Sequence, residues 1–342
     1  MLIFIVILSG IISFLISLWL IKRTDKFGLL DIPNMRSSHE KPTPKGGGAG
    51  IVLGILFALT GYWLAGKIKM DIKYFVIIGG FLAVASVGFY NDRFNSSALS
   101  RIILQTFIAS TMVWFMGSPV VLEIGGHNFN IGYFGIIFAV IWLVGVTNFY
   151  NFMDGINGLA AMQGIIAGIG ITIFGMILKD KSLIPMGLVL SGATAVFLIL
   201  NFSPAKIFMG DAGSYALGLY IASFGLVDGR LLVPVVLVLG VFIFDTVVTL
   251  IRRIIKGERW YQAHRTHFYQ RAVKLGYSHL QVTSVLSVIS FLLTVMACIY
   301  LQALPLVKIS IIVVAVLGLF SLALWIILKE GKYKRLKETG GM

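Results

Sequence analysis

The chain has 342 residues, of which 58% are hydrophobic and only 12% are charged. Ordinary water-soluble domains carry about 25% charged residues, so this composition excludes a pair of soluble domains and indicates an integral membrane protein. The net charge of +14 would favour a nucleic-acid partner in a soluble protein. In a membrane protein, an excess of positive charge mainly indicates which loops lie on the cytoplasmic side. We therefore expect no nucleic-acid partner. The single cysteine, Cys298, excludes an internal disulfide framework and a cysteine-based metal cluster.

Long apolar stretches recur along the whole chain, and a helix needs about 17 to 25 such residues to cross the hydrocarbon layer. We predict about eleven transmembrane helices, at residues 2–21, 47–65, 74–90, 102–117, 132–149, 158–178, 183–200, 212–227, 232–251, 284–303 and 309–328. The stretch 212–227 is the weakest of these predictions, because it is short and interrupted by glycine. No basic residue precedes the first stretch, so we expect a membrane span there and not a cleavable signal peptide. The expected fold is a single all-α polytopic membrane domain over residues 1–342.

The distribution of Lys and Arg over alternate loops predicts the orientation. One set of loops holds 21 of the basic residues: 22–45, 91–101, 150–157, 201–211, 252–283 and the tail after 328. The other set holds seven: 66–73, 118–131, 179–182, 228–231 and 304–308. The bias places the first set in the cytoplasm, with the N-terminus outside and the C-terminus inside. The basic tail 329–342 is interpreted as a short surface anchor, and the active site is expected on the cytoplasmic face.

A glycine-rich segment, KPTPKGGG, ends the first cytoplasmic loop. It places Lys41 and Lys45 before three glycines at a predicted helix start. Backbone N–H groups at such a helix start, next to lysines, can hold phosphate oxygens. A polybasic cytoplasmic loop with a flexible hinge would explain the same residues.

Acidic and amide side chains follow at three further cytoplasmic span ends. Asp92 lies just past the third span, where an acid is more often a helix cap than a metal ligand. The segment NFYNFMDGING spaces four polar side chains three residues apart, on one face if the segment is helical: Asn148, Asn151, Asp154 and Asn157. Such residues at a membrane boundary need polar partners, which could be a ligand or neighbouring helices.

Two later segments suggest binding of phosphate and a cation. Asp211 in MGDAGS lies at the start of a predicted helix. Because Mg²⁺ is usually held by one or two carboxylates plus substrate oxygens, Asp211 is a candidate Mg²⁺ ligand. The alternative is that Asp211 only caps the helix. The loop AHRTHFYQ places His264 and His267 on either side of Arg265. No third ligand such as Cys lies nearby, so phosphate contact is favoured over a metal site. A membrane-surface helix attracted to anionic lipid is the alternative.

Taken in this order, KPTPKGGG, NFYNFMDG, MGDAGS and AHRTHFYQ resemble the motifs of the polyprenyl-phosphate N-acetylhexosamine-1-phosphate transferase family (glycosyltransferase family 4). The resemblance covers nearly the whole chain. The family includes the phospho-N-acetylmuramoyl-pentapeptide transferases, whose late loop carries a run of adjacent histidines. The separated histidines of AHRTHFYQ are more similar to the branch that initiates O-antigen and related surface polysaccharides.

The resemblance implies transfer of an N-acetylhexosamine 1-phosphate, GlcNAc or a related 6-deoxy amino sugar, from a UDP-sugar to undecaprenyl phosphate. UMP would be released, with Mg²⁺ or Mn²⁺ as cofactor, in the bacterial inner membrane. The implied catalytic residues are Asp92, Asp211, His264 and His267, with Asp211 as the metal ligand. The implied substrate-binding residues are Lys41, Lys45, Asn148, Asn151, Asp154, Asn157, Phe208 and Arg265, with Phe208 stacked on uracil. The expected partners are the two substrates and the lipid bilayer, and a homodimer is one option for the oligomeric state.

Two positions depart from the family pattern. Asn91 stands where the family usually has the first of two adjacent acids, and Asn157 stands where it commonly has Asp. Asn91 can be neither a base nor an anionic metal ligand. A phosphate monoester has a second pKa of about 6, so the lipid nucleophile is already ionised at neutral pH and has little need of a base.

Two alternatives stay open at this point. Within the family, the alternative is the pentapeptide transferase of peptidoglycan synthesis. From another class, the alternative is a secondary transporter. Transporter sites usually lie near the membrane midplane, whereas the ionisable residues here gather at one face.

Overall fold

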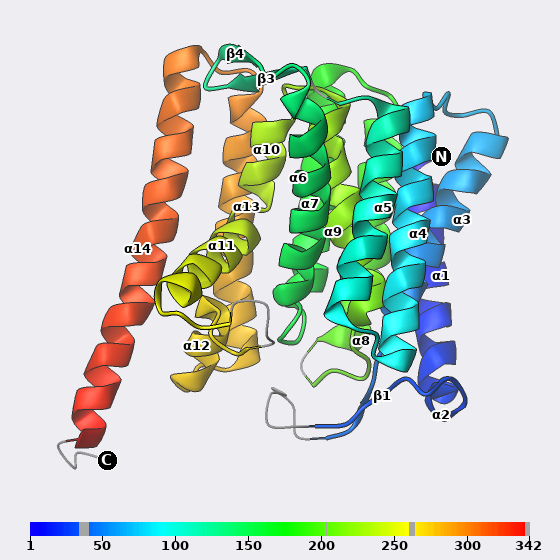
Figure 1. Ribbon diagram of the computed structural model, residues 1–342. Coiled ribbons are helices and arrows are strands. Elements are labelled where there is room, and N and C mark those ends of the chain that lie inside the picture. The colour runs from blue at the N-terminus through cyan, green and yellow to red at the C-terminus, as the bar shows by residue number, and fades with distance from the viewer. Residues whose placement is uncertain (34–40, 119, 203, 260–263, 339–342) are drawn as a thin grey trace.

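The computed structural model describes residues 1–33, 41–118, 120–202, 204–259 and 264–338, and its long helices run side by side in one bundle (Figure 1). The helices are α1 (Leu2–Lys22), α2 (Thr24–Phe27), α3 (Gly48–Leu64), α4 (Ile72–Phe94), α5 (Ala98–Met116), α6 (Phe134–Phe152), α7 (Leu159–Leu178), α8 (Leu183–Asn201), α9 (Gly210–Val227), α10 (Leu232–Val238), α11 (Gly240–Ile255), α12 (Phe268–Lys274), α13 (His279–Tyr300) and α14 (Pro305–Glu338). Two short antiparallel pairs join β1 (Leu30–Asp31) to β2 (Thr43–Pro44) and β3 (Val121–Ile124) to β4 (His127–Asn130).

The helices confirm an all-α protein of the membrane class. Within the described ranges, eight helices are long and apolar enough to cross a membrane, or nine if the bent pair α10 and α11 counts as one span. All eleven predicted stretches fall on helices. However, α3 has only 17 residues and α9 is not among the eight, so the number eleven stays a prediction.

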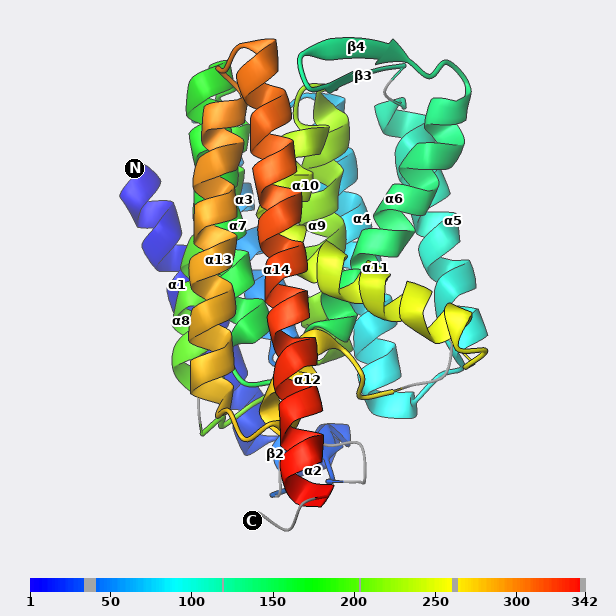
Figure 2. The same cartoon turned by 90° about the vertical axis from the view of Figure 1, so that its left-hand side faces the viewer.

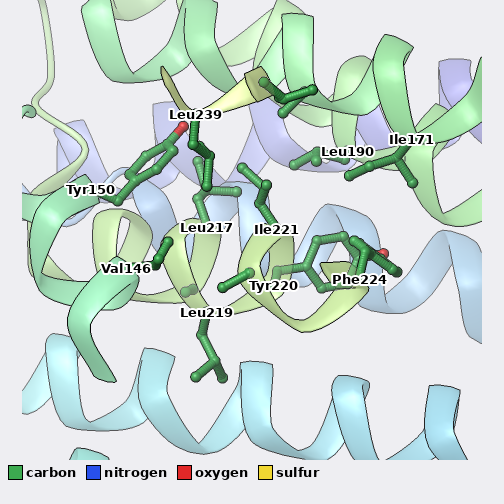
Figure 3. Packing of buried hydrophobic residues seen from close by; sticks show 14 of the residues in the cluster. Val146, Tyr150, Ile171, Leu190, Leu217, Leu219, Tyr220, Ile221, Phe224 and Leu239 are labelled. Carbon is green, nitrogen blue, oxygen red and sulfur yellow. The ribbon is translucent and has the colours of Figure 1, made fainter. Parts of the chain in front are cut away.

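The central helix is α9, the one for which the sequence signal was weakest. Every residue from Ala212 to Leu226 is buried, so this helix meets protein on all sides. Figure 3 shows side chains of α6, α7 and α8 gathered around those of α9, including Val146, Ile171 and Leu190. A helix without lipid contact gains from small residues that allow close packing, which explains its interruption by glycine.

Glycines allow α9 to pack closely against α3. A Cβ added at Gly48 would lie 2.1 Å from the Cα of Gly213, so the two backbones touch at this crossing. On the next turn of α9, a Cβ at Gly218 would lie 2.9 Å from the Cα of Thr147 in α6. These contacts hold the beginning of α9 at the point where α3, α4 and α6 converge.

The span predicted at 232–251 is broken in the structure, because α10 and α11 meet at an angle of 80°. Helix α11 has a buried polar side that includes Asp245 and Thr249, and an exposed apolar side that includes Ile251 and Ile255. A helix with one polar and one apolar side is suited to lying along a protein surface facing lipid. Figure 2 shows α11 running obliquely outward from the bundle, above α12.

The two predicted sets of loops lie at opposite ends of the bundle. Figure 1 shows the hairpin β3–β4 at the upper end, and α2, β1, α12 and the C-terminus at the lower end. The separation of the loops is as predicted, and which end faces the cytoplasm stays a prediction. The basic tail expected at 329–342 begins as a continuation of α14, which runs to Glu338.

Candidate active site

Three carboxylates, Asp92, Asp154 and Asp211, come together at the lower end of the bundle. Asp92 lies in the last turn of α4 and is buried, and its two oxygens accept the backbone N–H groups of Asp211 and Ala212, each at 3.0 Å. A carboxylate at a helix N-terminus satisfies free N–H groups and the positive end of the helix dipole. Gly210 has φ +72°, and a Cβ there would lie 2.6 Å from Asp92 Oδ2, so only glycine allows this approach.

The side chain of Asp211 is held by two asparagines. Asn91 Nδ2 donates to Asp211 Oδ2 at 2.5 Å, and Asn151 Nδ2 donates to Asp211 Oδ1 at 2.8 Å. Asn91 in turn accepts the hydroxyl of Ser96 at 2.7 Å, and Asn151 also donates to Ser214 at 2.8 Å. The amide at position 91 therefore has a direct role, because a carboxylate there would face Asp211 at hydrogen-bond distance.

Asp154 lies in the loop between α6 and α7. Its burial, and then the negative charges of Asp211 and Asp92, raise the pKa of Asp154 well above its usual range. Three other elements hold the ends of this loop. Asn201 accepts the N–H of Gly158 at 3.0 Å, Tyr269 donates to the carbonyl of Phe152 at 2.9 Å, and Thr283 donates to the carbonyl of Asn157 at 3.0 Å.

The predicted row of four polar side chains is brought to the acidic cluster only in part. Asn151 and Asp154 belong to the cluster, and Asn157 is in the same loop as Asp154. Asn148 lies one turn further into the bundle and donates to Gln105 of α5 at 2.7 Å. Its hydrogen bond therefore joins α6 to α5, which corresponds to the interhelical alternative.

The glycine-rich segment pairs with the residues that precede α9. The N–H groups of Gly47 and Gly48 donate to the carbonyls of Phe208 and Met209, at 3.0 and 2.8 Å, and Phe208 N donates to Pro44 O at 2.8 Å. These two glycine amides are thus engaged within the protein, and phosphate binding by the glycine-rich segment stays a prediction. The pairing places Phe208 next to this segment, and the charge of Lys45 acts on Asp92. Lys41 is exposed.

The two histidines lie together at the start of α12. Their ring centroids are 4.8 Å apart, and the ring of His267 is 6.0 Å from that of Phe152 at the end of α6. Burial, and then His267 and Arg253, lower the pKa of His264 to about 4, so its ring is neutral at pH 7. Arg265, between them in sequence, lines a separate basic pocket with Arg271.

Asp245 orients this histidine loop, and the sequence analysis did not include it among the site residues. Its carboxylate lies 3.1 Å from His267 Nδ1 and accepts the N–H groups of Phe268 and Tyr269, at 2.9 and 3.0 Å. It thereby caps α12 and, as acceptor for Nδ1–H, leaves Nε2 of His267 available. An acid inside an apolar stretch needs a buried partner, and this signal could have identified Asp245.

The acidic cluster supplies oxygen donors of the kind that hard cations prefer. Across the described parts of the chain, no three Asp, Glu, His or Cys side chains form a ready group of metal ligands. Mg²⁺ commonly takes only one or two carboxylates and completes its shell with water and substrate phosphate, so Asp211 and Asp154 fit such a site. The asparagine amides can also turn their oxygens toward a cation, because the oxygen and nitrogen of an amide are assigned from the hydrogen-bond pattern.

Comparison of the sequence with known proteins identifies the family to which the chain belongs. The profile of glycosyl transferase family 4 matches residues 74–228, which include Asp92, Asp154 and Asp211. A probable undecaprenyl-phosphate N-acetylglucosaminyl 1-phosphate transferase of Bacillus subtilis is 30% identical over 291 residues, covering 81% of this chain and 79% of the relative. A decaprenyl-phosphate N-acetylglucosaminephosphotransferase of Mycolicibacterium smegmatis is 30% identical over 308 residues, covering 79% and 75%.

The pentapeptide branch also matches, at lower identity. A phospho-N-acetylmuramoyl-pentapeptide-transferase of Clostridium beijerinckii is 27% identical over 290 residues, covering 79% of this chain and 86% of the relative. The resemblance inferred from the motifs is thereby confirmed. The chain belongs to glycosyl transferase family 4, and it is a multi-pass membrane enzyme of the polyprenyl-phosphate N-acetylhexosamine-1-phosphate transferase type.

Proposed function

We propose that this protein transfers N-acetylglucosamine 1-phosphate from UDP-N-acetylglucosamine to undecaprenyl phosphate, releasing UMP. The reaction would be the first membrane step of a cell-envelope polysaccharide such as O-antigen, at the bacterial inner membrane. The observation that carries the proposal is the convergence of Asp92, Asp211, Asn91 and Asn151 at the start of the buried helix α9. The names of the two relatives at 30% identity support the sugar.

The chemistry needs positioning and charge neutralisation more than proton transfer. An oxygen of the lipid phosphate attacks the phosphorus that carries the sugar, and the bond from that phosphorus to the UMP oxygen breaks. Because the lipid phosphate is mostly dianionic at pH 7, the protein has to bring two anions together. Mg²⁺ held by Asp211 and Asp154, or Mn²⁺ in its place, would neutralise charge on the pyrophosphate.

The chain's own residues divide the remaining tasks. Asp92 acts by positioning, because both of its oxygens hold the backbone at the start of α9. Lys45 provides positive charge beside the cluster. His267, oriented by Asp245, presents Nε2 toward the phosphates together with His264. Asn151 and Asn157 contact the nucleotide, and Phe208 stacks on uracil.

The proposal is tested on the purified full-length protein with undecaprenyl phosphate and a panel of UDP-sugars, by measuring UMP release. We expect turnover of UDP-N-acetylglucosamine that depends on Mg²⁺ or Mn²⁺. Asp211→Asn keeps the size of the side chain and should abolish turnover. Asp25→Asn is the matched control, because Asp25 is exposed in α2 at the same end of the bundle. Full activity of Asp211→Asn, or full activity in excess chelator, would contradict the assignment of the metal ligand.

The same panel decides between the branches. Preferential turnover of UDP-N-acetylmuramoyl-pentapeptide would assign the chain to the pentapeptide branch. Absence of UMP release with every sugar, together with substrate uptake into vesicles, would favour a transporter.

A further inference from the structure

A basic pocket lies outside the acidic cluster, between the end of α11, α12 and the last turns of α14. Figure 2 shows α14 passing in front of α12, below the outward-running α11. The volume of the pocket is ≈ 310 Å³. Its charged lining residues are four cations and one carboxylate: Arg252, Arg265, Arg271, Lys274 and Glu330. The described lining therefore carries an excess of three positive charges.

The guanidinium of Arg271 is buried and only partly satisfied. Its Nε and Nη2 donate to Glu330 at 2.7 and 2.5 Å, and its central carbon lies 4.7 Å from the centroid of the Phe268 ring. The third nitrogen, Nη1, is buried and has no hydrogen-bond partner among the described residues, and Arg271 as a whole is 6% exposed. Since a buried N–H group without an acceptor is unfavourable, an additional acceptor here would stabilise the fold.

The other cations are held close to one another. Lys274 Nζ donates to the carbonyl of Arg265 at 2.6 Å, and burial and then the charge of Arg265 lower the pKa of Lys274. Within the part of the chain that the structure describes, Arg252 Nε is buried and has no hydrogen-bond partner. Like charges at such proximity repel, and an anion with several oxygen acceptors would relieve both the repulsion and the unsatisfied N–H groups.

An apolar pocket adjoins the basic one along the same two helices. It has a volume of ≈ 110 Å³ and is lined by Phe268 and Ala272 of α12, Val285 of α13, and Trp325 and Ile326 of α14. Helices α12 and α14 line both pockets. An anionic site at the end of an apolar one, on helices that face the membrane, matches a phospholipid rather than a soluble phosphate.

We propose that the basic pocket of Arg252, Arg265, Arg271 and Lys274 binds the phosphate group of an anionic membrane phospholipid, and that an acyl chain of this lipid occupies the adjoining apolar pocket. The lipid is separate from the two substrates of the proposed reaction. Its phosphate accepts the unsatisfied guanidinium N–H groups and joins α11, α12 and α14. Because His267 immediately precedes α12, the bound lipid braces the histidine loop.

The test is native mass spectrometry of the full-length protein with equal amounts of phosphatidylglycerol and phosphatidylcholine. We expect retention of one phosphatidylglycerol in preference to phosphatidylcholine. The double variant Arg252→Gln, Lys274→Gln should reduce that preference by about thirtyfold, the order expected for two basic residues. The matched control, Lys22→Gln with Lys26→Gln, removes two exposed charges at the same end of the bundle and should keep the preference. The charge-conserving variant Arg252→Lys, Lys274→Arg should keep most of it, which separates loss of charge from loss of fold.

Three outcomes would overturn the proposal. They are equal retention of the two lipids by the unmodified protein, the same loss in the control as in the double variant, and displacement of phosphatidylglycerol by millimolar inorganic phosphate alone. Saturating undecaprenyl phosphate should leave phosphatidylglycerol bound. Displacement of phosphatidylglycerol by undecaprenyl phosphate would be a fourth outcome that overturns the proposal, because the pocket would then belong to the acceptor substrate. None of these measurements depends on turnover, so the lipid site and the proposed reaction can fail independently.

Discussion

Asn91 and Asp92 are neighbours in the chain, yet they hold different parts of Asp211. Asn91 donates to its carboxylate at 2.5 Å, and Asp92 accepts its backbone N–H at 3.0 Å. Replacing Asn91 by Asp would place two carboxylates in direct contact, which is unfavourable unless a cation lies between them. The amide thus suits a site in which Asp211 and Asp154 already supply the negative charge.

We expect Asn91→Asp to lower the melting temperature when a chelator is present. Addition of Mg²⁺ should restore the melting temperature. The rate of UMP release should change by about tenfold or less, equivalent to about 1.4 kcal/mol. Asp92→Asn removes the charged cap of α9 and should reduce the rate far more. Thermal unfolding with and without Mg²⁺, together with the UMP assay, checks both expectations. A chain that is inactive as it stands and is restored by Asn91→Asp would refute this assignment.

His264 makes the stability of the folded protein depend on pH. Its folded pKa of about 4 is below the value of about 6.5 for an unfolded chain. Between these values the unfolded chain binds a proton that the folded protein does not, so stability is lost as the pH falls from about 6.5 to about 4. We expect the melting temperature to fall over this window, and His264→Gln to make the fall shallower. His127→Gln, at an exposed position of the β3–β4 hairpin, should leave the fall unchanged.

At the scale of elements, α12 depends on a carboxylate from α11. Asp245 accepts both N–H groups at the start of α12, besides orienting His267. We expect Asp245→Asn to destabilise the protein by about 1 kcal/mol, as loss of a helix cap does, and to reduce UMP release. Amide hydrogen exchange should increase at Phe268 and Tyr269. Thr249→Val removes a single donor to Asp245 and should have a smaller effect on both measurements. Unchanged exchange in Asp245→Asn would exclude the capping role.

The crossing of α3 and α9 offers a test within one helix. Gly48→Ala would place a Cβ 2.1 Å from the Cα of Gly213, so α9 and with it Asp211 would have to move. A Cβ at Gly61, also in α3, would meet no described atom within 4 Å. We expect Gly48→Ala to lower the melting temperature and UMP release strongly. Gly61→Ala should be neutral or stabilise by up to about 1 kcal/mol, because alanine favours the helix. Similar behaviour of the two variants would contradict the close crossing.

For the whole molecule, the charge bias of the loops predicts the orientation in the membrane. In a Cys298→Ser background, a cysteine replacing Asn128 in the hairpin should react with an impermeant thiol reagent in intact cells. A cysteine replacing Lys256 at the end of α11 should react only after the membrane is opened. Both positions are exposed in the structure, so accessibility to solvent is matched. The reverse labelling pattern would place the acidic cluster on the outer face.

The positions of the helices and the separation of their loops could be predicted from the sequence, because the thickness of the hydrocarbon layer sets the length of each apolar stretch. The motifs around Asp92, Asn151, Asp154 and Asp211 were also recognisable, since each is contiguous in the chain. The tertiary structure alone decided how they meet. Asp92 caps a helix that starts more than one hundred residues later, and Asp245 of α11 finds its partners at the start of α12, more than twenty residues along the chain. Such contacts leave no local periodicity. They depend on which helix is central, and α9 is central because its glycines allow neighbouring backbones to approach, a property that hydropathy does not measure.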